Sequence, residues 1–301
     1  MTTENPGLVP GYLDYDWRLM YTVNHDCIKF IHVAEAIRKM PIVHLDEQDI
    51  FYAARKLDNQ PVLLLLHGAG GSHLDWPPQL RRFEPLGSCA IDLPGHGRSA
   101  GPARPTVGAY ADVVLNLIRA LKLSEVILVG HSMGGAIALE IALRHPEEVV
   151  GLILVATGAR LRVNKALLQL VDSDFGAAVD HLVANTWGPK AEPGLVWQAS
   201  QLIRSCDPET MHMDFAACNE FDIMAQLGDV TLPTLVLVGT EDRMTQLKFG
   251  QYLAENIARA EFVPVEGAGH MLAMEQSQLV GEAIGDFIDR RLTNRWLTDK
   301  H

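Results

Sequence analysis

A serine framed by glycines between two regular elements places the strongest constraint on how this chain can fold. Residues 130–134 read Gly-His-Ser-Met-Gly; they follow the apolar run 126–129 and precede an Ala- and Leu-rich stretch that stops before Pro146. The run is typical of a buried strand, and the stretch is typical of a helix. In so tight a turn, Gly130 and Gly134 leave room where a Cβ would collide, and Ser132 stands at a helix N-terminus, where the dipole favours negative charge. This context predicts a nucleophilic serine.

Uninterrupted apolar runs predict a parallel sheet. Four of them stand at residues 62–66, 126–129, 152–155 and 235–238, and strands buried on both faces have this pattern. Helix-like stretches at residues 107–121 and 133–144 alternate with these runs, which favours an α/β fold with right-handed crossovers. Ahead of them, residues 40–45 and 49–53 read as an opening β-hairpin.

With this turn and this alternation, residues 40–292 resemble the α/β-hydrolase superfamily. They are most similar to its bacterial esterases, lactonases and carbon–carbon bond hydrolases with a helical cap. The resemblance implies the α/β-hydrolase fold, a mostly parallel, twisted sheet of eight strands flanked by helices with a helical cap insertion. It also implies a serine hydrolase. These motifs are specific for the fold and the catalytic machinery, whereas they do not select a substrate.

A serine hydroxyl needs a base, and the base needs an acid that orients it. In the family the acid and then the histidine follow the serine in the chain. Asp242 follows the run 235–238, and His270 ends a Gly-rich loop after a later strand-like run. Because all three follow parallel strands, we expect them at one edge of the sheet, with Ser132 as nucleophile, Asp242 as acid and His270 as base. Glu241 is the nearest rival of Asp242. The family often has proline shortly after the acid, where this chain has Gln246.

The loop after the run 62–66 predicts an oxyanion hole. Residues 67–71 read His-Gly-Ala-Gly-Gly, and the family uses such a loop to aim a backbone N–H at the developing oxyanion. By resemblance the donors are the N–H groups of Ala69 and Met133. We also expect Gly70 and His67 to contact the substrate. The alternative interpretation of residues 67–68 is a tight structural turn, which would still lie beside the serine.

Residues 160–228 interrupt the alternation and read as several helices. We therefore divide the chain into an N-terminal extension (1–39), a core (40–159 and 229–301) and a helical cap (160–228). Large apolar side chains of the cap line a substrate pocket or form the cap's own core, and we expect both, for different residues. The pocket candidates are Trp187, Met213 and Phe215, together with Trp197 and Met211. The extension has a possible helix at residues 25–39, and its role stays open between partner docking, a contribution to the cap and an upstream start.

A second Gly-rich loop is interpreted as structural. Residues 91–99 match a family loop, and we expect Asp92 and Arg98 to hold it. The Gly-x-Gly pairs at residues 68–70 and 95–97 lack the full GxGxxG spacing at a strand-to-helix turn, which disfavours nucleotide binding. We expect the histidines of the Gly-rich motifs to shape the rim of the active site; they are His67, His96 and His131.

Composition restricts the partners. The net charge of −12 repels phosphate backbones, so we expect no nucleic-acid partner. The four cysteines show no metal-binding spacing, which favours free thiols in a reducing compartment. No apolar span is long enough for a bilayer and no secretion signal is present, so we expect a cytoplasmic protein with no membrane partner. The oligomeric state stays open between a monomer and a homodimer.

These residues predict a carboxylesterase-like serine hydrolase for small to medium acyl substrates, acting through an acyl-enzyme. It needs no metal and no cofactor, and its partner is a small-molecule ester or lactone. The alternative is a lactonase or a carbon–carbon bond hydrolase with the same three side chains. A receptor-like binding protein on the same fold is a third hypothesis, which the complete Ser-Asp-His set disfavours.

Overall fold

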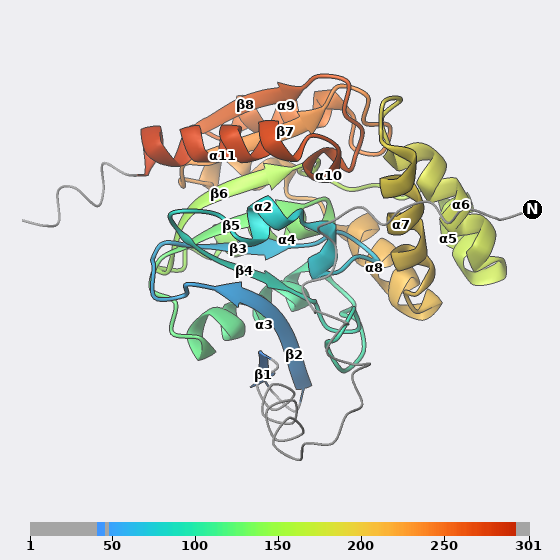
Figure 1. Cartoon of the computed structure of the whole chain (residues 1–301), viewed down its shortest axis with the longest axis horizontal. Coiled ribbons are helices and arrows are strands. Elements are labelled where there is room, and N and C mark those ends of the chain that lie inside the picture. The colour runs from blue at the N-terminus through green and yellow to red at the C-terminus, as the bar shows by residue number, and fades with distance from the viewer. Residues whose placement is uncertain (1–40, 46–47, 293–301) are drawn as a thin grey trace, which may run out of the picture. The chain divides into compact units, whose positions relative to one another are not determined.

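The computed structural model describes residues 41–45 and 48–292. Its eight strands form one sheet in the order β1-β2-β4-β3-β5-β6-β7-β8 (Figure 1). Their bounds are β1 (Ile42–Leu45), β2 (Gln48–Arg55), β3 (Val62–Leu66), β4 (Gly87–Ile91), β5 (Val126–His131), β6 (Val149–Val155), β7 (Thr234–Gly239) and β8 (Ala260–Val265). β1 pairs with β2, and β2 with β4, in antiparallel fashion, whereas every pair from β4 to β8 is parallel. The mostly parallel eight-stranded sheet is confirmed.

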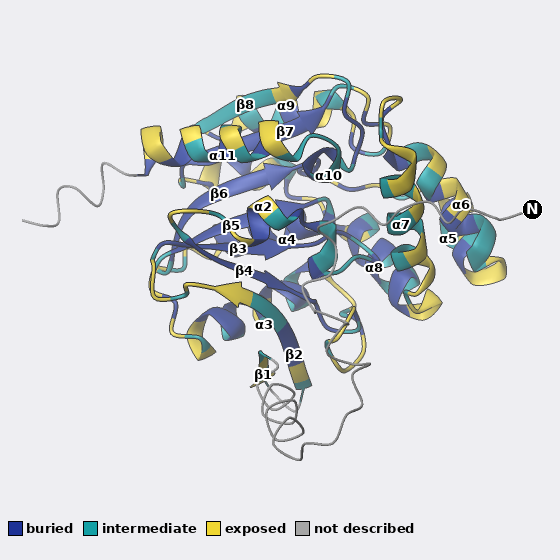
Figure 2. Cartoon of the chain, in the orientation of Figure 1, coloured by how far each residue is buried: buried dark blue, intermediate teal, exposed yellow. Residues whose placement is uncertain are grey.

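Two separate hydrophobic cores explain why the central strands are apolar throughout. Leu64 and Leu66 of β3 pack into one core, and Leu63 and Leu65 pack into the other, since successive side chains of a strand point to opposite faces. The first core includes α3 (Val107–Ala120), α4 (Met133–Leu143) and α9 (Leu247–Asn256). The second includes α2 (Pro78–Arg81), α10 (Leu272–Glu275) and α11 (Ser277–Arg291). Figure 2 shows the sheet buried between these helices.

Four helices lie between β6 and β7, where the alternation of strand and helix stops. They are α5 (Lys165–Ser173), α6 (Phe175–Thr186), α7 (Pro193–Arg204) and α8 (Pro208–Glu220). Each follows a residue whose side chain accepts a hydrogen bond from a backbone N–H of the first turn; these are Asn164, Asp174, Glu192 and Asp207. Figure 1 shows the four helices gathered at the end of the sheet toward which the arrows of β3 and β6 point. They therefore stand at the carboxyl ends of the parallel strands.

The elements predicted from the sequence agree with the structure within a few residues. The opening hairpin is β1 and β2, and the two predicted helices are α3 and α4. Two short 3₁₀ helices, η2 (His73–Asp75) and η3 (Met224–Asp229), were not predicted. The N-terminal extension with its possible helix at residues 25–39 lies outside the described residues.

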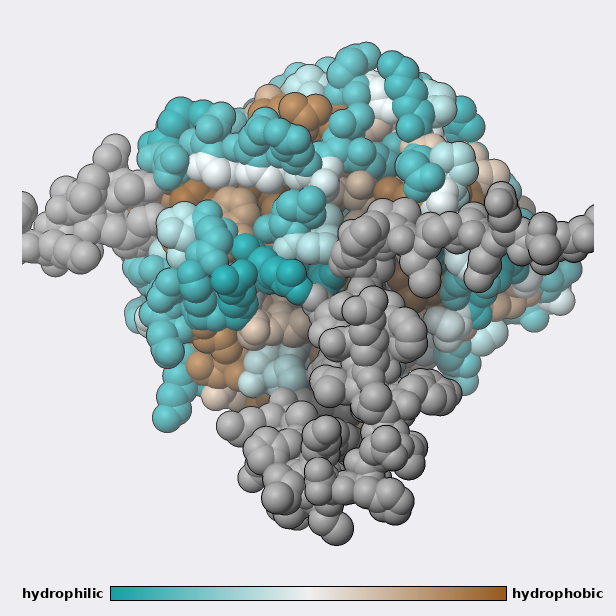
Figure 3. Space-filling model, in the orientation of Figure 1, coloured by the Kyte–Doolittle hydropathy of each residue, from teal (hydrophilic) through white to brown (hydrophobic). Residues whose placement is uncertain are grey.

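The surface of the described residues is largely polar on the face that Figure 3 shows. On α11, Arg290 and Arg291 form ion pairs with Glu261 of β8. Within the described ranges, each helix is too short or too polar to cross a bilayer.

Candidate active site

The turn between β5 and α4 holds Ser132 in a strained backbone conformation. Its φ is 52° and its ψ is −116°, a combination that costs a residue with a side chain of order 1–3 kcal/mol. The Ser132 N–H donates to the Val155 carbonyl at 3.0 Å, and the Ser132 carbonyl accepts from the Thr157 hydroxyl at 2.8 Å. A Cβ on Gly130 would overlap the carbonyl of Gly134, and one on Gly134 would overlap the carbonyl of Leu66. The glycines therefore have the steric role that the sequence predicts.

Asp242 and His270 lie in contact after β7 and β8. His270 Nδ1 is 2.9 Å from Asp242 Oδ2, and both side chains are almost completely buried. Thr245 donates its backbone N–H to Asp242 Oδ1 at 2.9 Å and its hydroxyl to Oδ2 at 2.8 Å. Burial alone would raise the pKa of Asp242, but the neighbouring His270 and the hydrogen bonds outweigh it and lower this pKa. The carboxylate is thus kept ionised, as an acid that orients a histidine must be.

The main chain of His270 is held against the turn that carries Ser132. His131, the residue before Ser132, donates its Nε2–H to the His270 carbonyl at 3.0 Å, and the two ring centroids are 4.7 Å apart. Burial and the nearby His270 lower the pKa of His131 to about 3, so His131 is neutral. On its other side, the His270 N–H donates to the Thr186 carbonyl at 2.7 Å. The nucleophile and the histidine therefore come from adjoining loops.

The loop after β3, at residues 67–71, packs against the turn that carries Ser132. A Cβ built on Gly68 would lie 3.2 Å from the Cβ of Ser132 and 3.0 Å from Nδ1 of His131. Ala69 follows in this loop, and Met133 is the first residue of α4. Of the two residues predicted to donate to an oxyanion, Met133 thus follows Ser132 directly, and Ala69 follows the glycine that lies against Ser132.

His67 occupies a position that differs from the sequence prediction. It is completely buried, and its Nδ1 donates to the Gly68 carbonyl at 2.8 Å while its Nε2 accepts from the Leu93 N–H at 3.0 Å. Burial, with His96 beside it, lowers the pKa of His67 to about 4. Both ring nitrogens are used within the protein, so the expectation that His67 contacts a substrate is wrong. His96 is also buried and does not lie on a rim.

The cap candidates occupy different surroundings. Phe215 belongs to an apolar cluster of α5, α6 and α8 that also contacts Ala69 and Met244, whereas Met213 packs against the core that contains α4. Trp187 is 8% exposed, and its indole nitrogen has no hydrogen-bond partner among the described residues. Trp197 on α7 is 64% exposed. Only part of the predicted apolar set therefore lies next to the loops that carry the site.

The loop at residues 91–99 is held as the sequence suggests. Asp92 is completely buried; its Oδ1 accepts from the His73 N–H at 2.7 Å, and its Oδ2 accepts from the Arg98 N–H at 2.8 Å. His73 belongs to η2, just after the loop at residues 67–71. Asp92 therefore connects that loop with the loop at residues 91–99.

Two residues of this region were missed from the sequence. Thr245 holds Asp242 in place, and its signal is a Thr three residues after an Asp, a spacing typical of turns. Asp214 is a completely buried acid on α8. Its signal is a single carboxylate within an otherwise apolar helix face, beside Met211 and Phe215.

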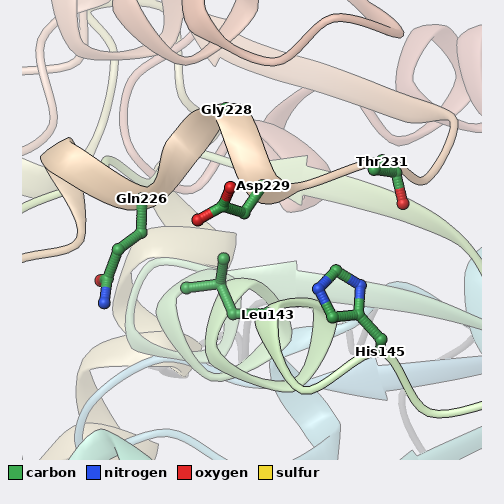
Figure 4. A pocket seen from close by; sticks show the side chains of 6 residues that line it. All are labelled: Leu143, His145, Gln226, Gly228, Asp229 and Thr231. Atoms are coloured by element: carbon green, nitrogen blue, oxygen red, sulfur yellow. The ribbon is translucent and has the colours of Figure 1, made fainter.

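The hollow drawn in Figure 4 lies away from this site. It has a volume of about 400 Å³ and is lined by Leu143, His145, Gln226, Gly228, Asp229 and Thr231. These residues end or follow α4 or precede β7, which places them at the amino ends of the strands. In the part of the chain that the structure describes, no three His, Cys, Asp or Glu side chains are arranged to hold a metal ion.

Comparisons with known proteins agree with the fold. The sequence profile of the alpha/beta hydrolase family matches residues 63–283. The 3-oxoadipate enol-lactonase 2 of Acinetobacter baylyi is 26% identical over 263 residues, which cover 81% of this chain and 97% of the enol-lactonase. A thermophilic esterase of known structure is 29% identical, with a TM-score of 0.75 over 83% of this chain and 97% of the esterase. The enol-lactonase structure from Burkholderia xenovorans LB400, 23% identical, has a TM-score of 0.78 over 83% of this chain and all of that one, and it supports the fold alone.

Proposed function

The chain belongs to the alpha/beta hydrolase family and is a hydrolase of ester bonds; we propose that Ser132, Asp242 and His270 carry out the reaction through an acyl-enzyme. The observation that carries this proposal is the buried contact of 2.9 Å between Asp242 and His270. Ser132 lies in a strained turn, and His131, the residue before it, links the loop of the histidine to that turn.

In the first half of the reaction His270 accepts the hydroxyl proton of Ser132 on Nε2 as the serine oxygen attacks the ester carbonyl. Asp242 accepts the Nδ1–H of His270, which fixes the tautomer and stabilises the imidazolium. The N–H groups of Ala69 and Met133 bind the oxyanion. The imidazolium then gives its proton to the leaving alcohol, and the acyl group remains on Ser132.

In the second half His270 accepts a proton from a water molecule, whose oxygen attacks the acyl-enzyme. The tetrahedral intermediate collapses, the carboxylic acid leaves, and the proton returns to Ser132. No residue beyond those already placed at this edge of the sheet is needed for proton transfer.

The surroundings of the site support a substrate with an apolar acyl group. The apolar cluster that includes Phe215 and Met211 contacts Ala69, a proposed oxyanion donor, and Met244, whose N–H donates to Asp242. We propose that α5 to α8 act as a cap and that Trp187, Phe215 and Gly70 contribute to substrate binding. A cytoplasmic location and the absence of nucleic-acid partners stay predictions from the sequence.

Lactone hydrolysis is the second candidate function. The similarity to an enol-lactonase over most of both chains favours it. A lactone would use the same acyl-enzyme, with the leaving alcohol still tethered to the acyl group. A panel of p-nitrophenyl esters of increasing chain length and simple lactones separates the two candidates, because kcat/KM ranks them directly.

The test of the proposed function is Ser132→Ala, with Ser200→Ala on the exposed α7 as the matched control. We expect S132A to lower turnover of p-nitrophenyl butyrate by several orders of magnitude and to abolish labelling by a fluorophosphonate probe. S200A removes a hydroxyl that donates to the Trp197 carbonyl and accepts from the Gln201 amide, so it should keep both. Turnover retained in folded S132A would refute the proposal.

A further inference from the structure

A buried carboxylate on α8 contacts three separate segments of the core. Asp214 Oδ2 accepts from the Gly70 N–H at 2.8 Å and lies 2.7 Å from His96 Nε2, and Oδ1 accepts from the Tyr110 hydroxyl at 2.6 Å. These partners come from the loop after β3, the loop after β4, and α3. A completely buried acid is tolerated only when it is this well partnered. Asp214 therefore fixes α8 to the core beneath it.

His96 and Asp214 form a buried ion pair. His96 Nδ1 lies 3.0 Å from the Pro94 carbonyl, which can only accept, so Nδ1 carries a hydrogen. Its Nε2 faces the carboxylate of Asp214. Burial would lower the pKa of His96, but the charge and the hydrogen bond of Asp214 outweigh it and raise this pKa. A carboxylate paired with an imidazolium is a stronger acceptor for the Gly70 N–H than a neutral group would be.

The carboxylate of Asp214 also orients the loop at residues 67–71, which carries Ala69. The Gly68 carbonyl accepts from His67 Nδ1 at 2.8 Å, which fixes the peptide plane before Ala69. The Gly70 N–H donates to Asp214, which fixes the peptide plane after Ala69. Because both flanking planes are held, the direction of the Ala69 N–H depends on the His67 ring and the Gly71 N–H on one side and on a carboxylate from α8 on the other.

We infer that Asp214 is a positioning residue for the oxyanion hole and couples α8 to the loop that carries Ala69. The inference rests on the proposed function. A second contact on α8 supports it, because a Cβ on Gly70 would lie 2.5 Å from Cε of Met211. Gly70 has a φ of +65°, so the loop depends on a glycine at the point where α8 touches it.

The test compares Asp214→Ala with Tyr110→Phe. D214A removes the acceptor of the Gly70 N–H, whereas Y110F removes the hydrogen bond to Oδ1, together with a backbone hydrogen bond from Arg104, and leaves Gly70 bound. Both should lower the melting temperature, since each leaves buried polar groups without a partner. We expect D214A to lower kcat/KM for p-nitrophenyl butyrate by about 10²–10³, as the loss of an oxyanion donor does. Y110F should leave kcat/KM nearly unchanged.

A pair of ketone inhibitors separates positioning from general destabilisation. A trifluoromethyl ketone adds the Ser132 oxygen to its carbonyl carbon, the serine proton moves to His270, and the carbonyl oxygen becomes an oxyanion. We expect D214A to weaken this inhibitor by the same factor as kcat/KM, while the methyl ketone of equal chain length, which binds without adduct formation, keeps its affinity. Equal losses of kcat/KM in D214A and Y110F, or an unchanged trifluoromethyl ketone affinity in D214A, would overturn the inference.

Two further variants keep the outcomes distinct. If D214A does not fold, Asp214→Asn replaces it: the neutral amide weakens the bond to Gly70, so kcat/KM and trifluoromethyl ketone affinity should both fall several-fold, and no fall in either overturns the inference. Asp222→Asn is the matched control, because Asp222 is an exposed acid paired with Arg160. If S132A loses turnover but D214A does not, only the inferred role of Asp214 is refuted. If S132A keeps turnover, the proposed function itself is refuted.

Discussion

At the scale of single residues, Ser132 combines a proposed chemical role with a conformational cost. Its φ of 52° and ψ of −116° are unfavourable for any residue with a Cβ. The hydrogen bonds of its N–H to Val155 and of its carbonyl with Thr157 hold it there. The strained turn lifts the Ser132 hydroxyl clear of the backbone. The conformation that exposes the nucleophile therefore lowers the stability of the fold at this position.

This conformational cost predicts that Ser132→Gly is more stable than Ser132→Ala. Glycine adopts the required dihedral angles without a steric penalty, whereas alanine keeps the strain. We expect S132G to exceed S132A in free energy of unfolding by roughly 1 kcal/mol, after allowing for the higher entropy of glycine in the unfolded chain. Urea unfolding of the two inactive variants measures the difference. A glycine variant less stable than the alanine variant would show that the turn is not strained.

Residue types and their places in the chain were enough to propose a catalytic set, but they could not predict the residues that hold this set in place. Asp242 and His270 could be located because each follows a strand, and parallel strands end at one edge. His67 was misread, because its partner Leu93 belongs to a different loop and no spacing rule connects the two. Asp214 was missed for the same reason, since its three partners lie 104 to 144 positions away in the sequence.

At the scale of elements, the end of α6 and the loop of His270 are joined by a network of hydrogen bonds. The Thr186 carbonyl accepts from the His270 N–H. The carboxylate of Glu275 on α10 accepts from the Gly188 N–H at 2.9 Å and from the Gly269 N–H at 3.0 Å. Glu275 therefore connects the segment after α6 with the residue that precedes the proposed base.

Glu275→Ala should loosen this connection and lower activity without touching a reacting group. Two backbone N–H groups lose their acceptor, and the His270 loop gains freedom. Since small misplacements of a catalytic group are costly, we expect kcat/KM for p-nitrophenyl butyrate to fall between about tenfold and a hundredfold. Glu282→Ala, at an exposed position of α11, is the control. Equal kcat/KM values for the two variants would exclude this role of Glu275.

The elements themselves were predictable to different degrees. β3, β5, β6 and β7 were found because burial on both faces makes the middle of each strand apolar without interruption. The four helices between β6 and β7 were foreseen only as a helical segment, although their capping side chains are visible in the sequence. How α8 packs on the core could not be read, because its hydrophobic residues face two different clusters, as Met213 and Phe215 do.

At the scale of the whole molecule, buried histidines give the fold a pH dependence of both signs. The pKa of His131 is lowered to about 3 and that of His67 to about 4, mainly by burial. Below pH 6.5 the unfolded chain binds protons on these residues while the folded chain does not, so stability is lost as the pH falls. His96 acts in the opposite sense: its raised pKa means that its contribution is complete below pH 6.5 and is lost as the pH rises through its folded value.

His131→Gln isolates one of these contributions. The glutamine amide can still donate to the His270 carbonyl but does not titrate, so the variant loses the acid sensitivity of this position alone. In the wild type, protonation of the unfolded histidine between pH 6.5 and pH 5 should cost about 2 kcal/mol, since each pH unit contributes about 1.36 kcal/mol over this range. The free energy of unfolding of the wild type relative to H131Q should therefore fall by about this amount from pH 8 to pH 5. Urea titrations of both proteins at the two pH values measure it. A difference that is constant with pH would mean that His131 takes up its proton over the same pH range in the folded protein as in the unfolded chain, and would refute the lowered pKa.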